Sequence, residues 1–306
     1  MTEVGAALAD TGTEFAAGRE ALWPLEHITL AGLNWSAQPE AANLRPMLLL
    51  HGWLDNSDTF THLAPELTCL GDVYAVDFAG HGHSGHRPPG QPYVLMDYVA
   101  DLAELIELHF DADKTPLDLI GHSLGGIVAA LYAAAFPERV RKLVLIDSLG
   151  ALSRHEHDVI PQLRRSISKR LAGSGKPALY PDLATAAKVR AGGLSPLSPD
   201  AALALIPRNM QKVESGWLWR TDSRLRYPSA LTLSEQQVLA SLAALSTPTL
   251  FVRAQSGLLA DNADITKIRA QVIKDFQQVD VPGGHHCHLD GDTRPVTEAV
   301  KRFLNQ

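Results

Sequence analysis

Short apolar segments alternate with amphipathic segments over most of the chain. Six short, largely apolar runs have the character of parallel strands that are buried on both faces. They are Met47–Leu50, Val73–Val76, Leu117–Ile120, Leu143–Ile146, Thr249–Val252 and Phe276–Val281. Segments with helical spacing lie between them, at Asp97–His109, Leu124–Ala135, Asn262–Lys274 and Pro295–Leu304. This alternation predicts an α/β fold with a mostly parallel, doubly wound sheet.

The residues before the first buried run have the pattern of an edge hairpin. We expect Glu26–Ser36 to form two antiparallel strands, with Gly32 at the turn between them. This hairpin would flank the parallel strands at one edge of the sheet.

The stretch Gly150–Pro228 differs from the rest of the chain in charge and in pattern. It holds 13 Lys and Arg against six Asp and Glu, a net charge of +7, whereas the whole chain carries −7 and the remainder therefore −14. Short helical segments in it are separated by prolines. We interpret residues 150–228 as a helical cap, inserted into a core that is formed by residues 1–149 and 229–306.

One helix of this cap is predicted at His157–Leu171. Its apolar residues share one helical face: Ile160, Leu163, Ile167 and Leu171. A basic amphipathic helix of this kind can lie on an anionic membrane, but we expect its apolar face to pack over the core. The positive cap can also steer anionic substrates toward a negative core.

Composition narrows the class of protein. Hydrophobic residues make up 45% of the chain, enough for a large core, and the net charge of −7 argues against nucleic-acid binding. The longest apolar run, Ile127–Phe136, has ten residues and is shorter than the ~20 residues of a membrane span, so stable membrane insertion is not expected. The first residues, Met1–Phe15, lack the basic start of a signal peptide. Two cysteines, Cys69 and Cys287, provide no disulfide framework, and we expect a cytoplasmic protein.

The central motif is Gly121-His122-Ser123-Leu124-Gly125, a G-x-S-x-G. It follows the buried run Leu117–Ile120 and opens the helix that begins at Leu124. In this context a serine stands on a sharp strand-to-helix turn with its hydroxyl exposed. Ser123 is therefore the predicted nucleophile.

An acyl-transfer site also needs donors for the oxyanion and a base. The N–H of Leu124 is one predicted donor, and the N–H of Trp53, in the loop after Met47–Leu50, is the second. The base is predicted in the segment Gly283–His288, which follows the last strand. We assign it to His285, directly after the glycines, while His286 and His288 could instead cap the following helix or pack in the core.

Four segments together resemble the α/β-hydrolase fold family, in the group of epoxide hydrolases, haloalkane dehalogenases and small serine esterases. They are HGWLDN (51–56), DFAGHGHS (77–84), GHSLGG (121–126) and GGHHCH (283–288), and they occur in the family's order. Within the family the chain is most similar to serine hydrolase-like proteins, through HGW and RTDSRLR (220–226). Ser123 stands where dehalogenases and epoxide hydrolases of this group have an aspartate, which argues against those two activities.

The chain differs from the family's usual pattern at the position of the catalytic acid. This acid usually follows the seventh strand, but Gly257 stands where this resemblance places the aspartate. Asp147, at the end of the run Leu143–Ile146, is our preferred acid because some dehalogenases of the family place theirs at that strand end. Asp261 and Asp264, on a lengthened loop, are the alternatives.

The resemblance and the motifs imply a serine hydrolase that cleaves small carboxylic esters through a Ser123–His285–Asp147 triad and an acyl-enzyme. Thioester, lactone, C–C bond and perhydrolase chemistry on the same triad remain alternatives. Trp53 and His122 are candidate substrate contacts, and Trp53, Trp217 and Trp219 are equally compatible with an apolar pocket and with core packing. We expect no cofactor, and the sequence indicates no particular oligomeric state.

Two interpretations from other classes compete with this one. His81, His83 and His86 have the H-x-H-x-x-H spacing of metallo-β-lactamase-like hydrolases, but Gly85 stands where these usually have an aspartate. We therefore expect no metal. A non-catalytic relative is the other alternative, and the glycine at position 257 is its only support.

Overall fold

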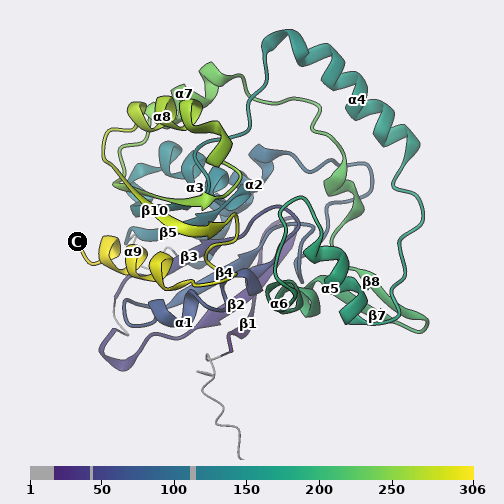
Figure 1. Ribbon diagram of the computed structural model, residues 1–306, viewed down its shortest axis with the longest axis horizontal. Coiled ribbons are helices and arrows are strands. Elements are labelled where there is room, and N and C mark those ends of the chain that lie inside the picture. The colour runs from purple at the N-terminus through teal and green to yellow at the C-terminus, as the bar shows by residue number, and fades with distance from the viewer. Residues whose placement is uncertain (1–16, 42–43, 111–114) are drawn as a thin grey trace, which may run out of the picture.

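The structure is a computed structural model that describes residues 17–41, 44–110 and 115–306 (Figure 1). The expectation about a signal peptide falls on Met1–Phe15, which lie outside the described residues. An eight-stranded sheet forms the centre of the molecule, in the order β1-β2-β4-β3-β5-β6-β9-β10. Its strands are β1 (Arg19–Pro24), β2 (Thr29–Trp35), β3 (Met47–Leu50), β4 (Val73–Asp77), β5 (Leu117–His122), β6 (Val140–Ile146), β9 (Thr249–Ser256) and β10 (Phe276–Gly284).

The sheet is mostly parallel. β2 pairs antiparallel with β1 and with β4, and all other neighbours pair in parallel. The predicted doubly wound α/β architecture is confirmed. The carboxyl ends of the parallel strands meet at one edge of such a sheet, so the loops after β3, β5, β6, β9 and β10 are brought close together.

Helices cover both faces of the sheet (Figure 1). They are α1 (Ala64–Leu67), α2 (Leu95–His109), α3 (Leu124–Ala135), α7 (Glu235–Ala243), α8 (Ala263–Val272) and α9 (Arg294–Leu304). Leu102 of α2, Val128 of α3 and Val238 of α7 belong to one buried cluster, and Leu67 of α1 and Val300 of α9 belong to the other. Each face of the sheet thus has its own apolar core.

An antiparallel hairpin lies at this edge of the sheet, but its predicted bounds and turn are wrong, because Glu26–Ser36 contains only β2 and the partner strand β1 precedes this range. The turn lies between β1 and β2, at residues 25–28, and Gly32 is in the middle of β2, opposite Ala21. A Cβ atom at position 32 would lie 2.1 Å from the carbonyl oxygen of Ala75 and 2.7 Å from the ring of Trp23. Gly32 is therefore required by a close approach between strands and not by a turn.

The segment between β6 and α7, residues 150–228, is called the cap segment below. It contains α4 (Val159–Ala172), α5 (Leu183–Ala191), α6 (Pro199–Asn209), β7 (Met210–Val213) and β8 (Gly216–Trp219). α5 and α6 share a small buried cluster with Met210, separate from the two cores of the sheet. The β7–β8 hairpin was not predicted in this helical segment. The division into a core and a cap remains a prediction.

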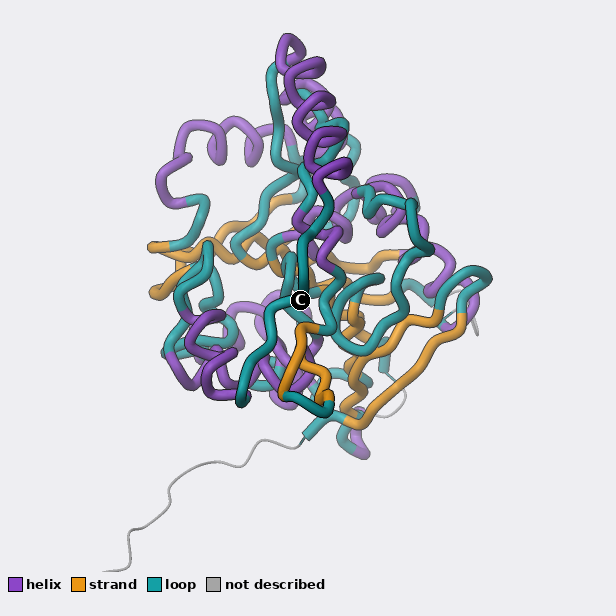
Figure 2. The backbone as a smooth tube through the Cα atoms, turned by 90° about the vertical axis from the view of Figure 1, so that its right-hand side faces the viewer, coloured by secondary structure: helices purple, strands orange, loops and turns teal. Residues whose placement is uncertain are grey.

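The predicted helix at His157–Leu171 is present as α4, but the expectation that its apolar face packs over the core is wrong. The buried residues of α4 are Gln162 and Ser166, whereas Ile160, Ile167 and their apolar neighbours on the same face are exposed. Figures 1 and 2 show α4 standing out at the top of the molecule. Among the described helices, none is long and apolar enough to cross a membrane.

Candidate active site

Ser123 lies on the tight turn between β5 and α3. Its φ of 51° is in the left-handed region, which a residue with a side chain rarely adopts. A Cβ atom at position 121 would lie 2.5 Å from backbone atoms of Gly125, and one at position 125 would lie 2.0 Å from the carbonyl oxygen of Leu50. The two glycines of the motif are therefore required by close backbone packing, which presents Ser123 at the carboxyl edge of the sheet.

His285 and Asp147 meet at the same edge, from the ends of β10 and β6. Nδ1 of His285 lies 2.6 Å from Oδ2 of Asp147, and both side chains are buried. A carboxylate only accepts hydrogen bonds, so Nδ1 of His285 donates, and Nε2 of a neutral ring is left as a proton acceptor. His285 and Ser123 line the same cavity.

The space above Gly257 is occupied by the carboxylate of Asp147. A Cβ atom at position 257 would lie 2.3 Å from Asp147 Oδ2, and the N–H of Leu258 donates to the same oxygen at 3.0 Å. The loop after β9 thus receives an acid from β6 instead of supplying one. Asp261 and Asp264 are exposed, and neither forms a hydrogen bond or ion pair with His285 among the described residues.

The two residues predicted to supply oxyanion donors lie in the loop after β3 and at the start of α3. The N–H of Leu124 opens α3, and the N–H of Trp53 lies in the loop after β3; within the described chain neither donates a backbone hydrogen bond outside a helix or strand. Leu54, Ser123 and Asp147 are the residues other than glycine with positive φ in the described ranges. Backbone strain is thus concentrated around one cavity, as is common at functional sites.

The model of the α/β hydrolase fold family matches residues 45–292 of the chain. The chain belongs to the α/β-hydrolase fold family. The match spans the nucleophile turn, the loop after β3, the cap segment and the histidine loop. The predicted resemblance is confirmed, and Ser123 stands at the strand-to-helix turn of this hydrolase fold.

Relatives support the assignment over nearly the whole chain. A serine hydrolase-like protein of Danio rerio is 30% identical over 305 residues, which cover 96% of this chain and 90% of the relative. The crystal structure of a hypothetical protein from Pseudomonas aeruginosa PAO1 is 34% identical, with a TM-score of 0.84, and covers 94% of this chain and 98% of its own. A pimeloyl-[acyl-carrier protein] methyl ester esterase of Neisseria meningitidis is 37% identical over 120 residues, which cover 39% of this chain and 42% of the esterase.

The other two histidines of the terminal loop have different partners. His288 lies 2.9 Å from the Thr59 hydroxyl and is fully buried. His286 lies 2.8 Å from Asp55 and 2.9 Å from the hydroxyl of Ser195. Neither contacts Asp147 by a hydrogen bond in the described part of the chain, which leaves His285 as the histidine paired with that acid.

His122 is buried and contacts the backbone of the histidine loop. Its Nε2 donates to the carbonyl oxygen of His285 at 3.0 Å, and its ring is completely buried. Burial, together with the neighbouring His288 and His285, lowers its pKa well below the usual value. A neutral His122 thus supports the backbone of His285, although it also forms part of the cavity wall.

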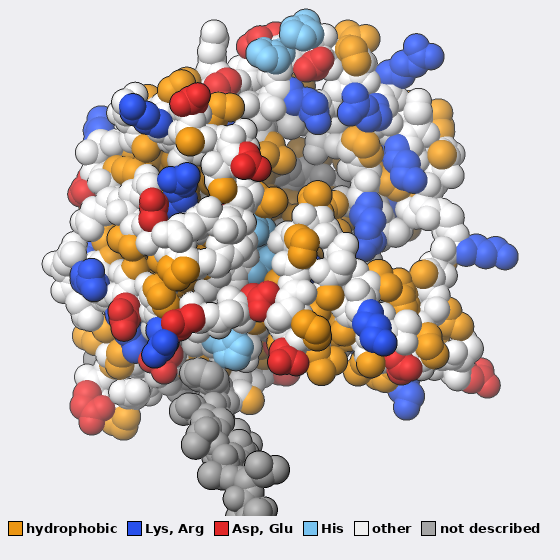
Figure 3. Space-filling model, in the orientation of Figure 1, with side chains coloured by type: hydrophobic (Ala, Val, Ile, Leu, Met, Phe, Trp, Pro, Cys, Tyr) orange, Lys and Arg blue, Asp and Glu red, His pale blue; other side chains and the backbone are white. Residues whose placement is uncertain are grey.

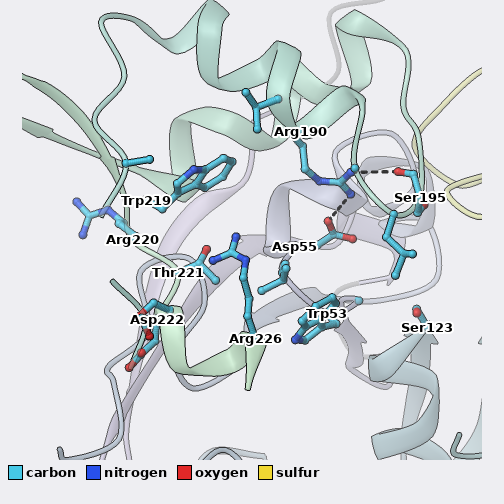
Figure 4. Close-up of a pocket in the computed structure, with 18 of the residues that line it drawn as sticks. Trp53, Asp55, Ser123, Arg190, Ser195, Trp219, Arg220, Thr221, Asp222 and Arg226 are labelled. Atoms are coloured by element: carbon cyan, nitrogen blue, oxygen red, sulfur yellow. Dashed lines mark hydrogen bonds and ion pairs between the residues drawn. The ribbon is translucent and has the colours of Figure 1, made fainter. Parts of the chain in front are cut away.

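A link between the cap segment and the loop after β3 was missed by the sequence analysis. Arg190 of α5 pairs with Asp55 at 2.8 Å, on the carboxylate that also binds His286 (Figure 4). Burial by itself raises the pKa of Asp55, but the charge and hydrogen bond of His286 and the charge of Arg190 hold it well below its usual range. In the sequence, Asp55 is visible only as the aspartate of HGWLDN. Nothing there indicates that it pairs with Arg190, 135 residues away.

The H-x-H-x-x-H histidines do not converge. His81 is buried beside the ring of His51, and burial lowers its pKa to about 3. His83 lies 3.6 Å from Glu20, and His86 lies 3.5 Å from Asp222. The group of potential metal ligands in the described residues is a different one, Asp55, His122 and His286, and the guanidinium of Arg190 is already bound there.

The cavity beside Ser123 has a volume of about 760 Å³ and is lined by loops at the carboxyl edge of the sheet on one side and by the cap segment on the other. Figure 3 shows the surface hollowed between these two parts. Trp53 and Trp219 line the cavity, and both Trp217 and Trp219 pack against the small cluster of the cap segment. Trp219 therefore contributes to the pocket and to packing, whereas Trp217 contributes to packing.

Gly257→Ala is expected to lower the rate of hydrolysis by about 100-fold. The added Cβ atom would displace the Asp147 carboxylate that it meets at 2.3 Å, and His285 would lose its orientation. Gly192→Ala is the matched control, because its nearest contact is 3.9 Å away. Equal rates of the two purified variants on a p-nitrophenyl ester would contradict the assigned position of the acid.

Proposed function

We propose that this α/β-hydrolase fold protein is a serine hydrolase that acts on carboxylic esters, with Ser123, His285 and Asp147 as its catalytic triad. The observation that supports this most strongly is the 2.6 Å contact between His285 and Asp147, buried at the edge of the cavity that Ser123 also lines. It supports Asp147 as the acid although position 257 has none, and it weakens the argument for a non-catalytic relative.

The proposed mechanism assigns one step to each group. His285 Nε2 takes the proton of Ser123 as its hydroxyl oxygen attacks the acyl carbon, and Asp147 stabilises the imidazolium that forms. The N–H groups of Trp53 and Leu124 hold the oxyanion of the tetrahedral intermediate. His285 then gives the proton to the leaving alkoxide, and the acyl group stays on Ser123. Water, deprotonated by His285, attacks the acyl-enzyme; the bond between the acyl carbon and the Ser123 oxygen breaks, His285 returns the proton to that oxygen, and the carboxylic acid is released.

The cap segment forms the opposite wall of the proposed site. Residues of α5, of the loop after it and of β8 line the cavity together with the loop after β3. The shape of the cap segment therefore selects among esters of different size. The resemblance to an esterase of Neisseria meningitidis agrees with ester chemistry on this fold.

The experiment that tests the proposal combines turnover with labelling. Hydrolysis of a p-nitrophenyl ester series, from acetate to palmitate, is measured on the full chain, and a fluorophosphonate probe is mapped by mass spectrometry. We expect turnover with an optimum chain length and the label on Ser123. Turnover that survives complete labelling of Ser123, or a label on a different serine, would overturn the assignment.

A further inference from the structure

The cavity beside Ser123 carries more positive than negative charge on its wall. Its two carboxylates, Asp55 and Asp222, already have partners. Asp55 binds Arg190 and His286, each at 2.8 Å, and Asp222 binds Arg224 at 2.6 Å. The remaining basic side chains of the wall have no carboxylate partner among the described residues: Lys176, Arg220 and Arg226.

Arg226 reaches into the cavity. It ends the 3₁₀ turn Ser223–Arg226, and in Figure 4 its guanidinium extends into the open space, with Trp53 between it and Ser123. The turn is held in place because the carbonyl oxygen of Leu225 accepts a hydrogen bond from the Trp53 indole at 3.1 Å. The backbone of Arg226 is thus anchored while its charged end has no protein partner in the described chain.

Arg220 adds a second unsatisfied donor to the same wall. Its Nε is buried and has no hydrogen-bond partner among the described residues. Figure 4 shows its guanidinium directed away from Arg226 and Trp53, so Arg220 adds positive charge to the wall without reaching the space between Arg226 and Ser123.

We propose that the cavity binds esters that carry an anionic group, a carboxylate or a phosphate, at the end remote from the scissile carbonyl. Arg226 is the main ligand of that group, and the substrate lies along Trp53 between Arg226 and Ser123. A guanidinium matches carboxylate and phosphate oxygens with paired hydrogen bonds. The inference rests on the proposed ester hydrolysis and adds its substrate class.

The test compares two sets of p-nitrophenyl esters of equal acyl length, one ending in a methyl group and one in a carboxylate. For the wild type we expect a higher kcat/KM on the carboxylate set, and the advantage should shrink as salt screens the charge. Arg226→Gln should raise KM for the carboxylate set by about 10- to 100-fold and change the neutral set less than twofold. Arg226→Glu should reverse the preference toward esters that end in an ammonium group.

A matched control is Arg165→Gln, which removes one exposed positive charge from α4, outside the cavity. It should leave both substrate sets unchanged. A second arm compares 4-butyryloxybenzoate with 4-butyryloxybenzamide and shows whether the anion can also lie on the alcohol side, and phosphate is tested as a competitive inhibitor in place of the carboxylate.

These experiments distinguish failure of the anion subsite from failure of the proposed ester hydrolysis. Turnover of neutral and anionic esters at equal kcat/KM, or equal losses in Arg226→Gln and Arg165→Gln, would overturn the anion subsite and leave the serine hydrolase intact. Binding of adipate that depends on Arg226, measured by calorimetry, would support the subsite even if no ester were cleaved. In that case the proposed ester hydrolysis would be the part that fails.

α4 is an amphipathic helix whose polar side, and not its apolar side, faces the rest of the protein. Its polar side packs on the protein, where the side-chain amide of Gln162 donates to the carbonyl oxygen of Ser229 at 2.9 Å. Its apolar face points outward. The exposed fractions are Ile160 70%, Leu163 38%, Ile167 46% and Leu171 84%.

The charge of α4 indicates what covers this face. The helix contains four basic residues, Arg164, Arg165, Lys169 and Arg170, and no acidic one. Figure 3 shows Lys and Arg side chains in a row over this side of the molecule. A second copy would bring two strongly positive helices together. We infer that the apolar face of α4 docks reversibly on a membrane surface with anionic headgroups.

Flotation with vesicles tests this docking. The full chain should float with phosphatidylcholine–phosphatidylglycerol vesicles, remain in solution with phosphatidylcholine alone, and be released by high salt. Ile160→Ser/Ile167→Ser should reduce the bound fraction at least tenfold without changing turnover of a short soluble ester. The control is Ile265→Ser/Ile268→Ser, which removes two exposed isoleucines from α8. Equal binding of the two double variants, or dimers that the α4 variant abolishes, would overturn membrane docking.

Discussion

Ser123→Ala is expected to lower kcat on a short p-nitrophenyl ester by about 10⁶-fold, close to the loss seen when a whole triad is removed. The hydroxyl of Ser123 forms the covalent bond in the proposed mechanism, and the other groups act only through it. The residual rate would come from the oxyanion donors and from substrate binding. The measurement is kcat for purified wild type and variant, prepared side by side.

The control for this variant is Ser174→Ala, which makes the same change on the opposite wall of the same cavity, away from the nucleophile turn. Its kcat should stay within a factor of three of the wild type. Both variants should unfold at the wild-type temperature, because Ser123 already adopts its strained φ with a side chain present. Undiminished turnover by a folded Ser123→Ala protein would exclude the serine mechanism.

Elements with strong local patterns could be predicted from the sequence. Met47–Leu50 and Leu124–Ala135 have their predicted bounds as β3 and α3, because an apolar run and a helix after the nucleophile turn are both visible in a short window. Gly32 was misplaced because its constraint comes from Ala75, on a neighbouring strand. In α4, the spacing of the apolar residues predicted the helix correctly. That spacing cannot show which face of the helix packs against the protein.

In the candidate site, too, some residues could be predicted from the sequence and others could not. Ser123 and His285 stand in recognisable local contexts, a strand-to-helix turn and a loop after the last strand. The pairing of Asp55 with Arg190 could not be predicted, because it joins the loop after β3 to α5 of the cap segment, which lies far away in the sequence. The sequence alone did not explain why Gly257 stands where the family has an aspartate. In the structure, the carboxylate of Asp147 occupies the space that a side chain at position 257 would fill.

Asp147→Asn is expected to lower kcat by about 10⁴-fold while KM changes little. An asparagine at this position can present its NH₂ group to Nδ1 of His285, which would then accept, and the ring proton would move to Nε2. His285 would no longer be able to take the proton of Ser123. The loss would appear in kcat and kcat/KM together, measured on p-nitrophenyl esters from pH 6 to about pH 9.

Asp261→Asn and Asp264→Asn are the matched controls for this change, because each also removes one aspartate charge but from an exposed position near the same loop. Both should retain kcat within a factor of two, since no hydrogen bond or ion pair joins either carboxylate to His285 in the described chain. A larger loss in Asp261→Asn or Asp264→Asn than in Asp147→Asn would move the acid to the loop after β9. Such a result would require that loop to carry its acid toward His285 and displace the Asp147 carboxylate from above Gly257.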